Sequence, residues 1–420
     1  MVFDNIHDFL NYFLNENYRY DILYLSDKEL YKGLFNVAIE NEENPQYQTL
    51  LGYLYKYGEA GEKNLEKAFR YFYKAATNNQ PYGFYEVAVM YESGNGAPIQ
   101  SYNEAFSWYS KACEHNVAAA INNIAIFYEK GRVVNKDYQK AFELFEKAYK
   151  LGNPSALTNL AMYYRDGIAG VKDHKKAFEL YQEGVEKNDK YAMNQLGNMY
   201  EKGLGTPVDY QKAFKYYLMA AEKNMPTAMN NVGYCYEKGI GTNIDLKLAF
   251  TWYEKAAEHG EVYAMRNVAL FYKSGIGVEA NLTKAIYWFE KAAEGNHPGA
   301  MTHLGYMYEK GNGVTKDLAK AFNYYYKAAT LDFPIAINNV GVFYEHGYYV
   351  PQNLNTAISY YQKAANMGES VALYNLGLCY QAGRGVTKNY ETALQYFKKA
   401  YERGDSRGKK AYDNLLPYVK

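Results

Sequence analysis

The chain has 420 residues and carries 46 acidic and 46 basic side chains, so its formal net charge is zero. This balance argues against a general affinity for nucleic acids or anionic membranes. The first residues lack a basic segment followed by a long apolar core, and no apolar run approaches the roughly 18 residues of a membrane span. We therefore predict a cytoplasmic protein that does not insert into membranes, with export by a route without a signal peptide left open.

Residues 1–44 precede the regular part of the sequence and are expected to form two helices. The first helix is predicted over residues 6–14. The second is predicted to begin at Ser26, with Glu29 three residues later completing a capping box. We interpret this segment as an N-terminal helical cap, because the end of a repeat array must present a polar outer face.

From residue 45 to residue 405 one pattern returns ten times with a period of 36 residues, and the second copy has one additional residue in its loop. The copies are 45–80, 81–117, 118–153, 154–189, 190–225, 226–261, 262–297, 298–333, 334–369 and 370–405. A fixed period of this length is typical of a solenoid, in which each unit packs on its neighbours. The remaining residues, 406–420, are predicted to form a C-terminal capping helix that ends at Pro417.

The copy at 226–261 shows how one unit is expected to fold. Its first half has apolar residues at helical spacing and is followed by Gly239, which suits the left-handed backbone at a helix end. Asp245 is placed to cap a second helix with an apolar face that includes Phe250. The result is a pair of antiparallel helices, which can bury its apolar faces only by stacking on neighbouring pairs.

Some positions are filled in the same way in every copy when positions are numbered from the first residue of each unit. The helix-ending Gly stands at position 14, a Tyr at position 11, and Gly or Ala at position 8. We expect the small residue to let two helices approach closely and this Tyr to fill the space beside it. Local residue choice and the global pattern agree at each of these positions, as expected of a well-specified fold.

The unit resembles the Sel1-like repeat, a relative of the tetratricopeptide repeat. The family pattern, roughly A-x-x-x-L-G-x-x-Y-x-x-G-x-G-V-x-x-D-x-x-K-A-x-x-W-Y-x-K-A-A, is met over residues 300–329, and Trp252-Tyr253 and Trp108-Tyr109 supply its W-Y pair. The resemblance implies an all-α, right-handed αα-superhelix. It also implies a non-catalytic adaptor or scaffold for protein–protein interaction, because the family includes adaptors in membrane-protein degradation and bacterial signalling or host-interaction proteins.

The sequence offers no pattern for catalysis, a metal site or a cofactor. The G-x-G of the loops lies between two helices, without the strand and the G-K-[ST] of a phosphate-binding loop. The seven histidines are scattered, and neither H-E-x-x-H nor C-x-x-C occurs. Cys235 and Cys379 stand at the same inward position four units apart and should not meet, so we interpret the cysteines as buried thiols.

The candidate binding surface is the exposed side of the first helices, which line the concave face in related αα-solenoids. Positions 5 and 9 vary more than the core positions and carry groups that suit an extended peptide. We predict partner contacts at Asn122, Asn194, Asn230, Tyr234, Arg266, Leu270, Thr302, Tyr306, Asn338 and Tyr374. Arg266 is the expected anchor, because it is the only charged residue at these two positions.

Position 6 carries a row of amides, Asn123, Asn159, Asn231, Asn267, Asn339 and Asn375, with Gln195 and His303 in the same place. This regularity favours a structural hydrogen bond between neighbouring units, with ligand contact as the alternative. Two other functions stay open: an enzyme or enzyme-regulating subunit with a concave site, and a structural homo-oligomer packed through its end caps. The bulky loop 347–351 is an alternative contact point, and the sequence fits a monomer or a weak homo-oligomer.

Overall fold

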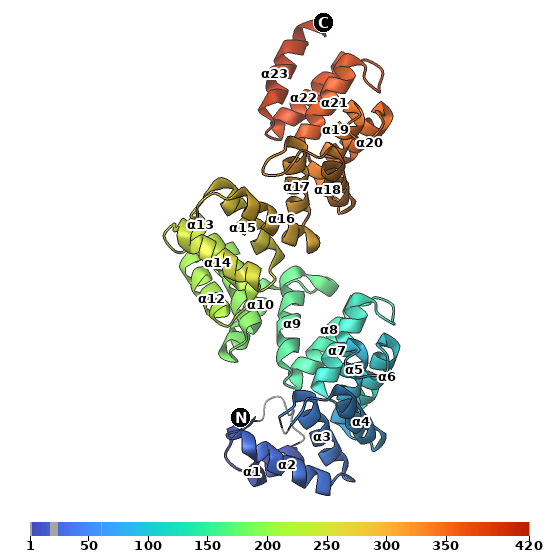
Figure 1. Ribbon diagram of the computed structural model, residues 1–420, viewed down its shortest axis with the longest axis vertical. Coiled ribbons are helices and arrows are strands. Elements are labelled where there is room, and N and C mark those ends of the chain that lie inside the picture. Colours follow the sequence, from blue (N-terminus) through green and yellow to red (C-terminus); the bar gives the residue numbers. More distant parts are fainter. Residues whose placement is uncertain (1, 17–23, 60, 420) are drawn as a thin grey trace. The chain divides into compact units, whose positions relative to one another are not determined.

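The computed structural model describes residues 2–16, 24–59 and 61–419. Nearly all of its regular structure is helical, as the sequence predicts (Figure 1). The strands found in these ranges are β1 (Val2–Phe3) and β2 (Tyr24–Leu25), which pair in parallel near the N-terminus. The all-α prediction is confirmed, with this two-residue pairing as an addition that the sequence pattern did not indicate.

Helices of similar length follow one another along the chain (Figure 1). Their bounds are α1 Ile6–Glu16, α2 Lys28–Glu40, α3 Pro45–Tyr57, α4 Leu65–Thr77, α5 Pro81–Ser93, α6 Tyr102–Glu114, α7 Ala118–Lys130, α8 Tyr138–Lys150, α9 Pro154–Asp166, α10 His174–Glu186, α11 Lys190–Lys202, α12 Tyr210–Glu222, α13 Pro226–Lys238, α14 Leu246–Glu258, α15 Val262–Ser274, α16 Leu282–Glu294, α17 Pro298–Lys310, α18 Leu318–Thr330, α19 Pro334–His346, α20 Leu354–Asn366, α21 Ser370–Ala382, α22 Tyr390–Glu402 and α23 Ser406–Leu415. Two short 3-10 helices, η2 (Ile168–Gly170) and η3 (Leu416–Tyr418), complete the set.

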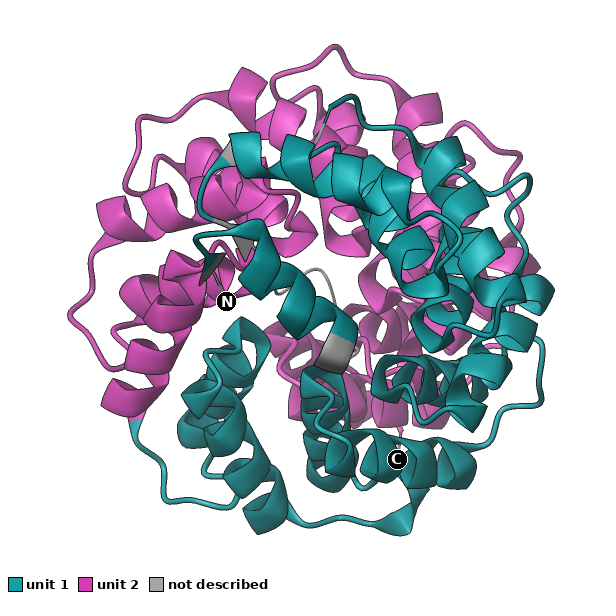
Figure 2. Ribbon diagram, turned by 90° about the horizontal axis from the view of Figure 1, so that it is seen from below, with its two compact units in different colours: residues 1–209 teal, residues 210–420 magenta. Residues whose placement is uncertain are grey.

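The chain divides into two compact units, residues 1–209 and 210–420 (Figure 2). In the first unit α3 packs on α4, α5 on α6, α7 on α8 and α9 on α10. In the second unit the pairs run from α13 with α14 to α21 with α22, and α23 packs on α22. Within each unit the second helix of one pair also packs on the first helix of the next, which is the stacking of a solenoid.

Backbone chemistry ends the first helix and begins the second. Gly239 adopts φ +72°, and Asp245 accepts hydrogen bonds from the N–H groups of Lys247 and Leu248 at 3.0 and 2.9 Å. Both predictions for this unit are confirmed. Val133 stands where most loops have a second Gly, yet it also adopts φ +66°. This backbone conformation is strained for a β-branched residue.

The small residue at position 8 is covered by a different ring from the one predicted. A Cβ on Gly233 would lie 2.7 Å from the ring of Tyr253, at position 28 of the same unit. The Tyr at position 11 instead packs edge-on against the Phe at position 25 of the preceding unit. This contact joins Phe250 to Tyr272 at 5.1 Å between ring centroids, and it recurs at Phe69–Tyr91, Phe142–Tyr164, Phe178–Tyr200, Phe214–Tyr236 and Phe322–Tyr344.

The predicted helix ends outside the repeats are corrected by the structure. Helix α2 begins at Lys28, and its cap is Asp27, whose carboxylate accepts the N–H of Glu29 at 3.0 Å. The predicted start at Ser26 is therefore wrong, because the neighbouring acid takes the capping role. Helix α23 ends at Leu415, before Pro417, which lies in the 3-10 helix that follows.

The N-terminal helices share a core with the first repeat. Phe9 of α1 and Leu34 of α2 are fully buried and belong to the same apolar cluster as Leu50 of α3. Phe35 and Tyr55 make an edge-to-face contact with centroids 5.5 Å apart. The N-terminal helices thus pack on the first repeat, and the role of the segment as a cap stays a prediction.

Candidate functional site

The predicted contact residues differ in exposure. We call the side of the first helices that carries positions 5, 9 and 12 the first-helix face. At position 9, Tyr234 and Tyr306 are 42% and 44% exposed. At position 5, Asn122, Asn194 and Asn338 are buried. Half-buried between these extremes are Asn230, Arg266, Leu270, Thr302 and Tyr374. The face therefore offers tyrosine rings to solvent while most of its asparagines turn inward.

The buried asparagines take part in bonds between neighbouring repeats. The amide at position 6 of one repeat donates to the amide oxygen at position 5 of the repeat before it. This bond joins Asn159 to Asn122, Asn267 to Asn230 and Asn375 to Asn338, with N···O distances of 3.0, 3.1 and 2.9 Å. The structural interpretation of the position-6 row is confirmed at these three interfaces. It also gives three of the predicted position-5 contacts a structural role.

Position 12 was not among the predicted contacts, yet its residues determine whether the first-helix face is negative or positive in each repeat. In several repeats this position is a Glu that accepts a hydrogen bond from the Tyr hydroxyl at position 28, which is position 29 in the second repeat because of its additional residue. The pairs are Tyr109 with Glu92, Tyr253 with Glu237, Tyr325 with Glu309 and Tyr361 with Glu345, at 2.8, 2.8, 2.9 and 2.5 Å. Burial, together with the nearby carboxylate, raises the pKa of Tyr253 well above its usual value. These phenols stay protonated and donate permanently.

A cation replaces the position-12 Glu in the repeats that begin at residues 45, 154 and 262, where Lys56, Arg165 and Lys273 stand. Phe289 replaces the Tyr at position 28 in the repeat of Lys273, so no buried hydroxyl loses its acceptor there. The charge reversal at position 12 was visible in the sequence. The aromatic at position 28 does not follow it strictly, since Arg165 stands with Tyr181 and Glu129 with Phe145.

Two of these cations are neutralised by carboxylates. Arg165 donates from Nε and Nη2 to both carboxylate oxygens of Asp166 at 2.7 Å, and from Nη1 to Gln195 at 2.6 Å. These hydrogen bonds from Arg165 lower the pKa of Asp166. Lys56 lies 2.6 Å from Oε2 of Glu86, whose side chain is buried. At both places the positive charge is neutralised within the chain and is not available to a ligand.

The third place is different, and we call it the Arg266 seam: Arg266 and Lys273 of the repeat 262–297, with His297 and His303 at the junction to the next repeat. The Arg266 guanidinium donates to Asn267 at 3.3 Å, and its buried Nε has no acceptor among the described residues. Burial lowers the pKa of Arg266, although the charge of Glu237 acts the other way. Within the described ranges Lys273 forms no ion pair, and its Nζ lies 5.9 Å from the centre of the Tyr306 ring.

Burial first, and nearby positive charge second, lower the pKa of both histidines of the seam. The ring of His303 stacks on Phe289 with centroids 5.0 Å apart. Burial, followed by the charges of Lys273, Arg266 and His297, lowers the pKa of His303 to about 4. Nδ1 of His297 accepts the backbone N–H of Ala300 at 3.2 Å and thereby caps α17. At neutral pH both rings are uncharged, and the seam carries two cations without a bonded carboxylate.

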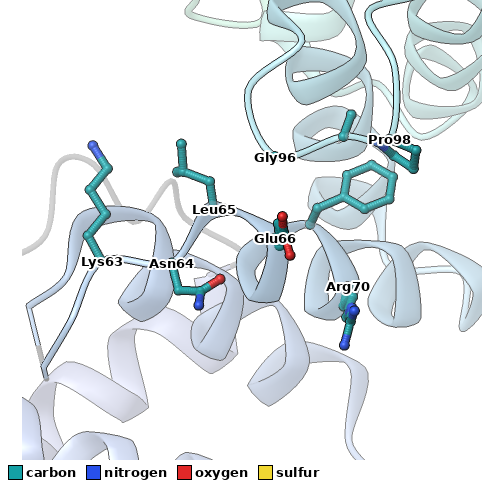
Figure 3. Close-up of a pocket in the computed structure, with 9 residues that line it drawn as sticks. Lys63, Asn64, Leu65, Glu66, Arg70, Gly96 and Pro98 are labelled. Atoms are coloured by element: carbon teal, nitrogen blue, oxygen red, sulfur yellow. The ribbon is translucent and has the colours of Figure 1, made fainter.

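A hollow of about 860 Å³ lies between α4 and the loop that precedes α6 (Figure 3). Its loop side includes Gly96 and Pro98, where the second repeat carries its additional residue. A Cβ on Gly96 would lie 2.4 Å from the carbonyl oxygen of Leu65, so the loop rests on the start of α4. Arg70 is exposed and points away from the loop in Figure 3. The hollow thus lacks a buried charged group to select a ligand.

Metal-binding clusters and membrane-spanning helices are both absent from the described ranges. No cluster of three or more His, Cys, Asp or Glu side chains there is arranged to hold a metal ion. None of the helices described combines the length and the apolar character needed to cross a bilayer.

Paired helices stacked at a 36-residue period place this chain in the class of αα-solenoid repeat proteins. The family model described as Sel1 repeat matches residues 45–80, 84–117, 118–153, 154–189, 190–225, 226–261, 262–297, 298–333, 334–369 and 370–405. The chain belongs to the Sel1 repeat family. Proteins of this family commonly mediate protein–protein interaction.

Solved structures of Sel1 repeat proteins resemble this chain over most of their length. A protective antigen present in uropathogenic Escherichia coli strains, displaying an SLR fold, is 25% identical with a TM-score of 0.52, over 92% of this chain and 91% of its own. A Sel1 repeat protein from Oxalobacter formigenes is 30% identical with a TM-score of 0.55, over 59% of this chain and 99% of its own. Among curated proteins, no sequence matches this chain.

Proposed function

We propose that this protein is a non-catalytic adaptor or scaffold that binds a peptide or protein partner through the first-helix face. The observation that carries the proposal is the combination of exposed Tyr234 and Tyr306 with half-buried Arg266 on three successive first helices; the Nε of Arg266 has no acceptor among the described residues. Tyrosine and arginine are the residue types that dominate binding energy at protein interfaces. The protein-binding role of the family supports the same function.

The architecture holds these groups in fixed places before a partner arrives. Arg266 and Tyr306 lie on helices whose other sides pack in the core through Val268 and Leu304, both fully buried. Side chains on packed helices lose little freedom on binding, so more of the contact energy appears as affinity. Tyr side chains add large contact area at a low entropy cost.

A random-peptide display library selected against the full chain tests this function. The variant Tyr234→Ala with Tyr306→Ala removes the exposed rings of the first-helix face. The matched control is Tyr287→Ala with Tyr326→Ala, which removes two rings of similar exposure, 52% and 45%, from second helices. We expect selected peptides to bind the first variant at least about tenfold more weakly, or about 1.4 kcal/mol, and the control as tightly as the original chain.

Two results would contradict the proposal. One is a selection that enriches no peptide at all. The other is a set of peptides that binds the first variant and the original chain equally, which would move the binding surface elsewhere. The loop around Tyr348 and Tyr349, 41% and 58% exposed, would then be the next surface to alter.

A further inference from the structure

We propose that the Arg266 seam is a carboxylate-binding site and that the partner of the first-helix face is a protein segment with Asp or Glu side chains. This inference rests on the proposed function and specifies the chemistry of its partner. It also assigns distinct roles to residues of the face: Arg266 and Lys273 hold the carboxylate, and Tyr306 covers it from one side.

Other cations that lie close to buried positions of this solenoid already have a carboxylate. Asp166 pairs with Arg165 at 2.7 Å, Glu86 with Lys56 at 2.6 Å, and Glu345 with Nη1 of Arg384 at 2.7 Å. These pairs show the chemistry that the interior of the fold uses to hold a guanidinium or an ammonium group. The Arg266 seam has the cations in the same setting, and the carboxylate is the missing part.

Burial makes the absence of a partner costly for Arg266. A charged group taken out of water needs hydrogen bonds or an opposite charge to offset its lost hydration. The Asn267 amide at 3.3 Å is a weak substitute, and the buried Nε has no acceptor in the described part of the chain. A carboxylate fits the planar guanidinium with two parallel hydrogen bonds, which neither a carbonyl nor an amide provides.

The acids on either side of the seam are already engaged. Glu237 accepts from Tyr253 at 2.8 Å and lies 2.6 Å from Lys238, while Glu309 accepts from Tyr325 and lies 2.5 Å from Lys310. Neither acid bonds to Arg266 or Lys273 among the described residues, although the charge of Glu237 acts on Arg266. Both also repel an acidic ligand from the neighbouring repeats, so the face favours a carboxylate at one place and disfavours it at the next.

The pKa of His303 can report binding at the seam. It should change when a carboxylate binds beside Arg266, and it should not change if Arg266 has only a structural role. The groups facing it are Lys273, Arg266 and His297, and together with burial they keep its ring neutral. A bound carboxylate would offset these charges and raise the pKa of His303 toward its ordinary value. Binding of an acidic ligand should therefore be accompanied by proton uptake at mildly acidic pH, and its affinity should rise as the pH falls toward about 5.

The sharpest variant adds one carboxylate and leaves every cation in place. Ser274 is exposed at position 13, where Asp166 stands beside Arg165 in the repeat 154–189. Ser274→Asp should place an internal acid beside Lys273, and Ser274→Asn is the neutral control of the same shape. The probes are the peptides selected by display on the full chain and their copies with each Asp or Glu replaced by Asn or Gln.

We expect the selected peptides to be enriched in acidic residues and to bind Ser274→Asp about tenfold more weakly than Ser274→Asn. Arg266→Gln should weaken the acidic peptides by a similar factor and leave their neutral copies unaffected. The His303 ring signal, followed by NMR during a pH titration, should shift its midpoint upward when an acidic peptide is bound. Melting curves of the variants check that they are folded.

Three results would overturn the inference. The first is a set of peptides that binds the first-helix face with no preference for acidic residues, which leaves the proposed function standing. The second is equal binding to Ser274→Asp and Ser274→Asn. The third is a random single-stranded RNA probe that binds through Arg266 more tightly than any peptide, which would assign the seam to phosphate. A selection without any peptide would instead count against the proposed function itself.

Discussion

Two places in the described part of this solenoid carry a guanidinium on a first helix, and they differ in whether a carboxylate of the chain bonds to it. In the repeat 154–189 the cation at position 12 is followed by Asp166, and the two form a closed pair. In the repeat 262–297 the cation at position 12, Lys273, is followed by Ser274, and Arg266 about two helical turns earlier adds a second charge. The first place is saturated, whereas the second still needs a carboxylate.

This difference shows that the fold alone does not decide where a repeat protein binds. Both places lie on first helices that end in a left-handed glycine, Gly167 and Gly275, yet the hydrogen-bonding groups of one are used up internally. Cations at position 12 recur three repeats apart at Lys56, Arg165 and Lys273. Each of these repeats therefore has a cation on its first helix. Whether that cation is neutralised within the chain depends on the residues around it, such as Asp166 beside Arg165.

The largest loss of stability should come from removing the Tyr–Glu hydrogen bond of an ordinary repeat, which serves as the reference for both places. Tyr253 is fully buried and donates to Glu237 at 2.8 Å. Glu237→Ala leaves that hydroxyl without its acceptor, so we expect the free energy of unfolding to fall by about 1–3 kcal/mol. Urea unfolding followed by circular dichroism measures the change.

The matched variant for this test copies the combination that the chain uses beside Arg266. Glu237→Lys together with Tyr253→Phe reproduces Lys273 and Phe289 at positions 12 and 28. The double variant should lose less stability than Glu237→Ala, because no buried hydroxyl is left unpaired. An equal or greater loss would show that the Tyr–Glu bond does not explain the combination of Lys273 with Phe289.

The sequence predicts the helical hairpins well because each of their determinants is local. Gly239 and Asp245 act on the backbone within a few residues of themselves, so their chemistry can be read in place. The bond between Tyr253 and Glu237 joins different helices, and the bond between Asn267 and Asn230 joins different repeats. Such partners become visible only when the stacking register is known.

The same reasoning explains how the candidate site changed. Position-5 asparagines look like free amides in the sequence, but the structure uses several of them as acceptors between repeats. Arg266 stood out in the sequence by its charge alone. What the sequence could not show is that no carboxylate of the described chain bonds to it, since that depends on the positions of Glu237 and Lys238.

The second prediction concerns the pH dependence of stability at the Arg266 seam. The pKa of His303 is about 4 in the folded protein, against 6.5 for an ordinary histidine. The unfolded chain therefore binds more protons between these values, and the free energy of unfolding falls as the pH falls through this window. At about pH 5 the loss should be about 1–2 kcal/mol.

The variant His303→Asn should remove this loss, because it installs the uncharged residue that other repeats have at position 6. Urea midpoints at about pH 7 and about pH 5 for both proteins measure the difference. His259→Asn is the control, since that histidine is exposed at the end of α14. If the original chain and His303→Asn lose equal stability between these pH values, the seam does not lower the pKa of His303.

The last prediction removes the carboxylate that neutralises Arg165. Asp166→Ser gives the repeat 154–189 the residue that stands beside Lys273, and it frees the Nε and Nη2 groups of Arg165. The stability cost should stay below about 1 kcal/mol, because the Asp166 side chain is 42% exposed and partly exposed ion pairs contribute little. In return, the variant should gain a second site for acidic peptides, since Arg165 then needs a carboxylate from outside.

Isothermal titration with an acidic peptide selected on the original chain should show an additional, weaker binding event in Asp166→Ser. The double variant Asp166→Ser with Arg165→Gln is the control, because it removes the cation and should lose the event again. Gln195 keeps its bond to Nη1 of Arg165 at 2.6 Å in the single variant, so the freed guanidinium stays oriented. If Asp166→Ser binds no second peptide, an unpaired guanidinium is insufficient by itself. The Arg266 seam would then owe its binding to the combination of two cations with the Tyr306 ring, and the comparison between the two places would narrow to that combination.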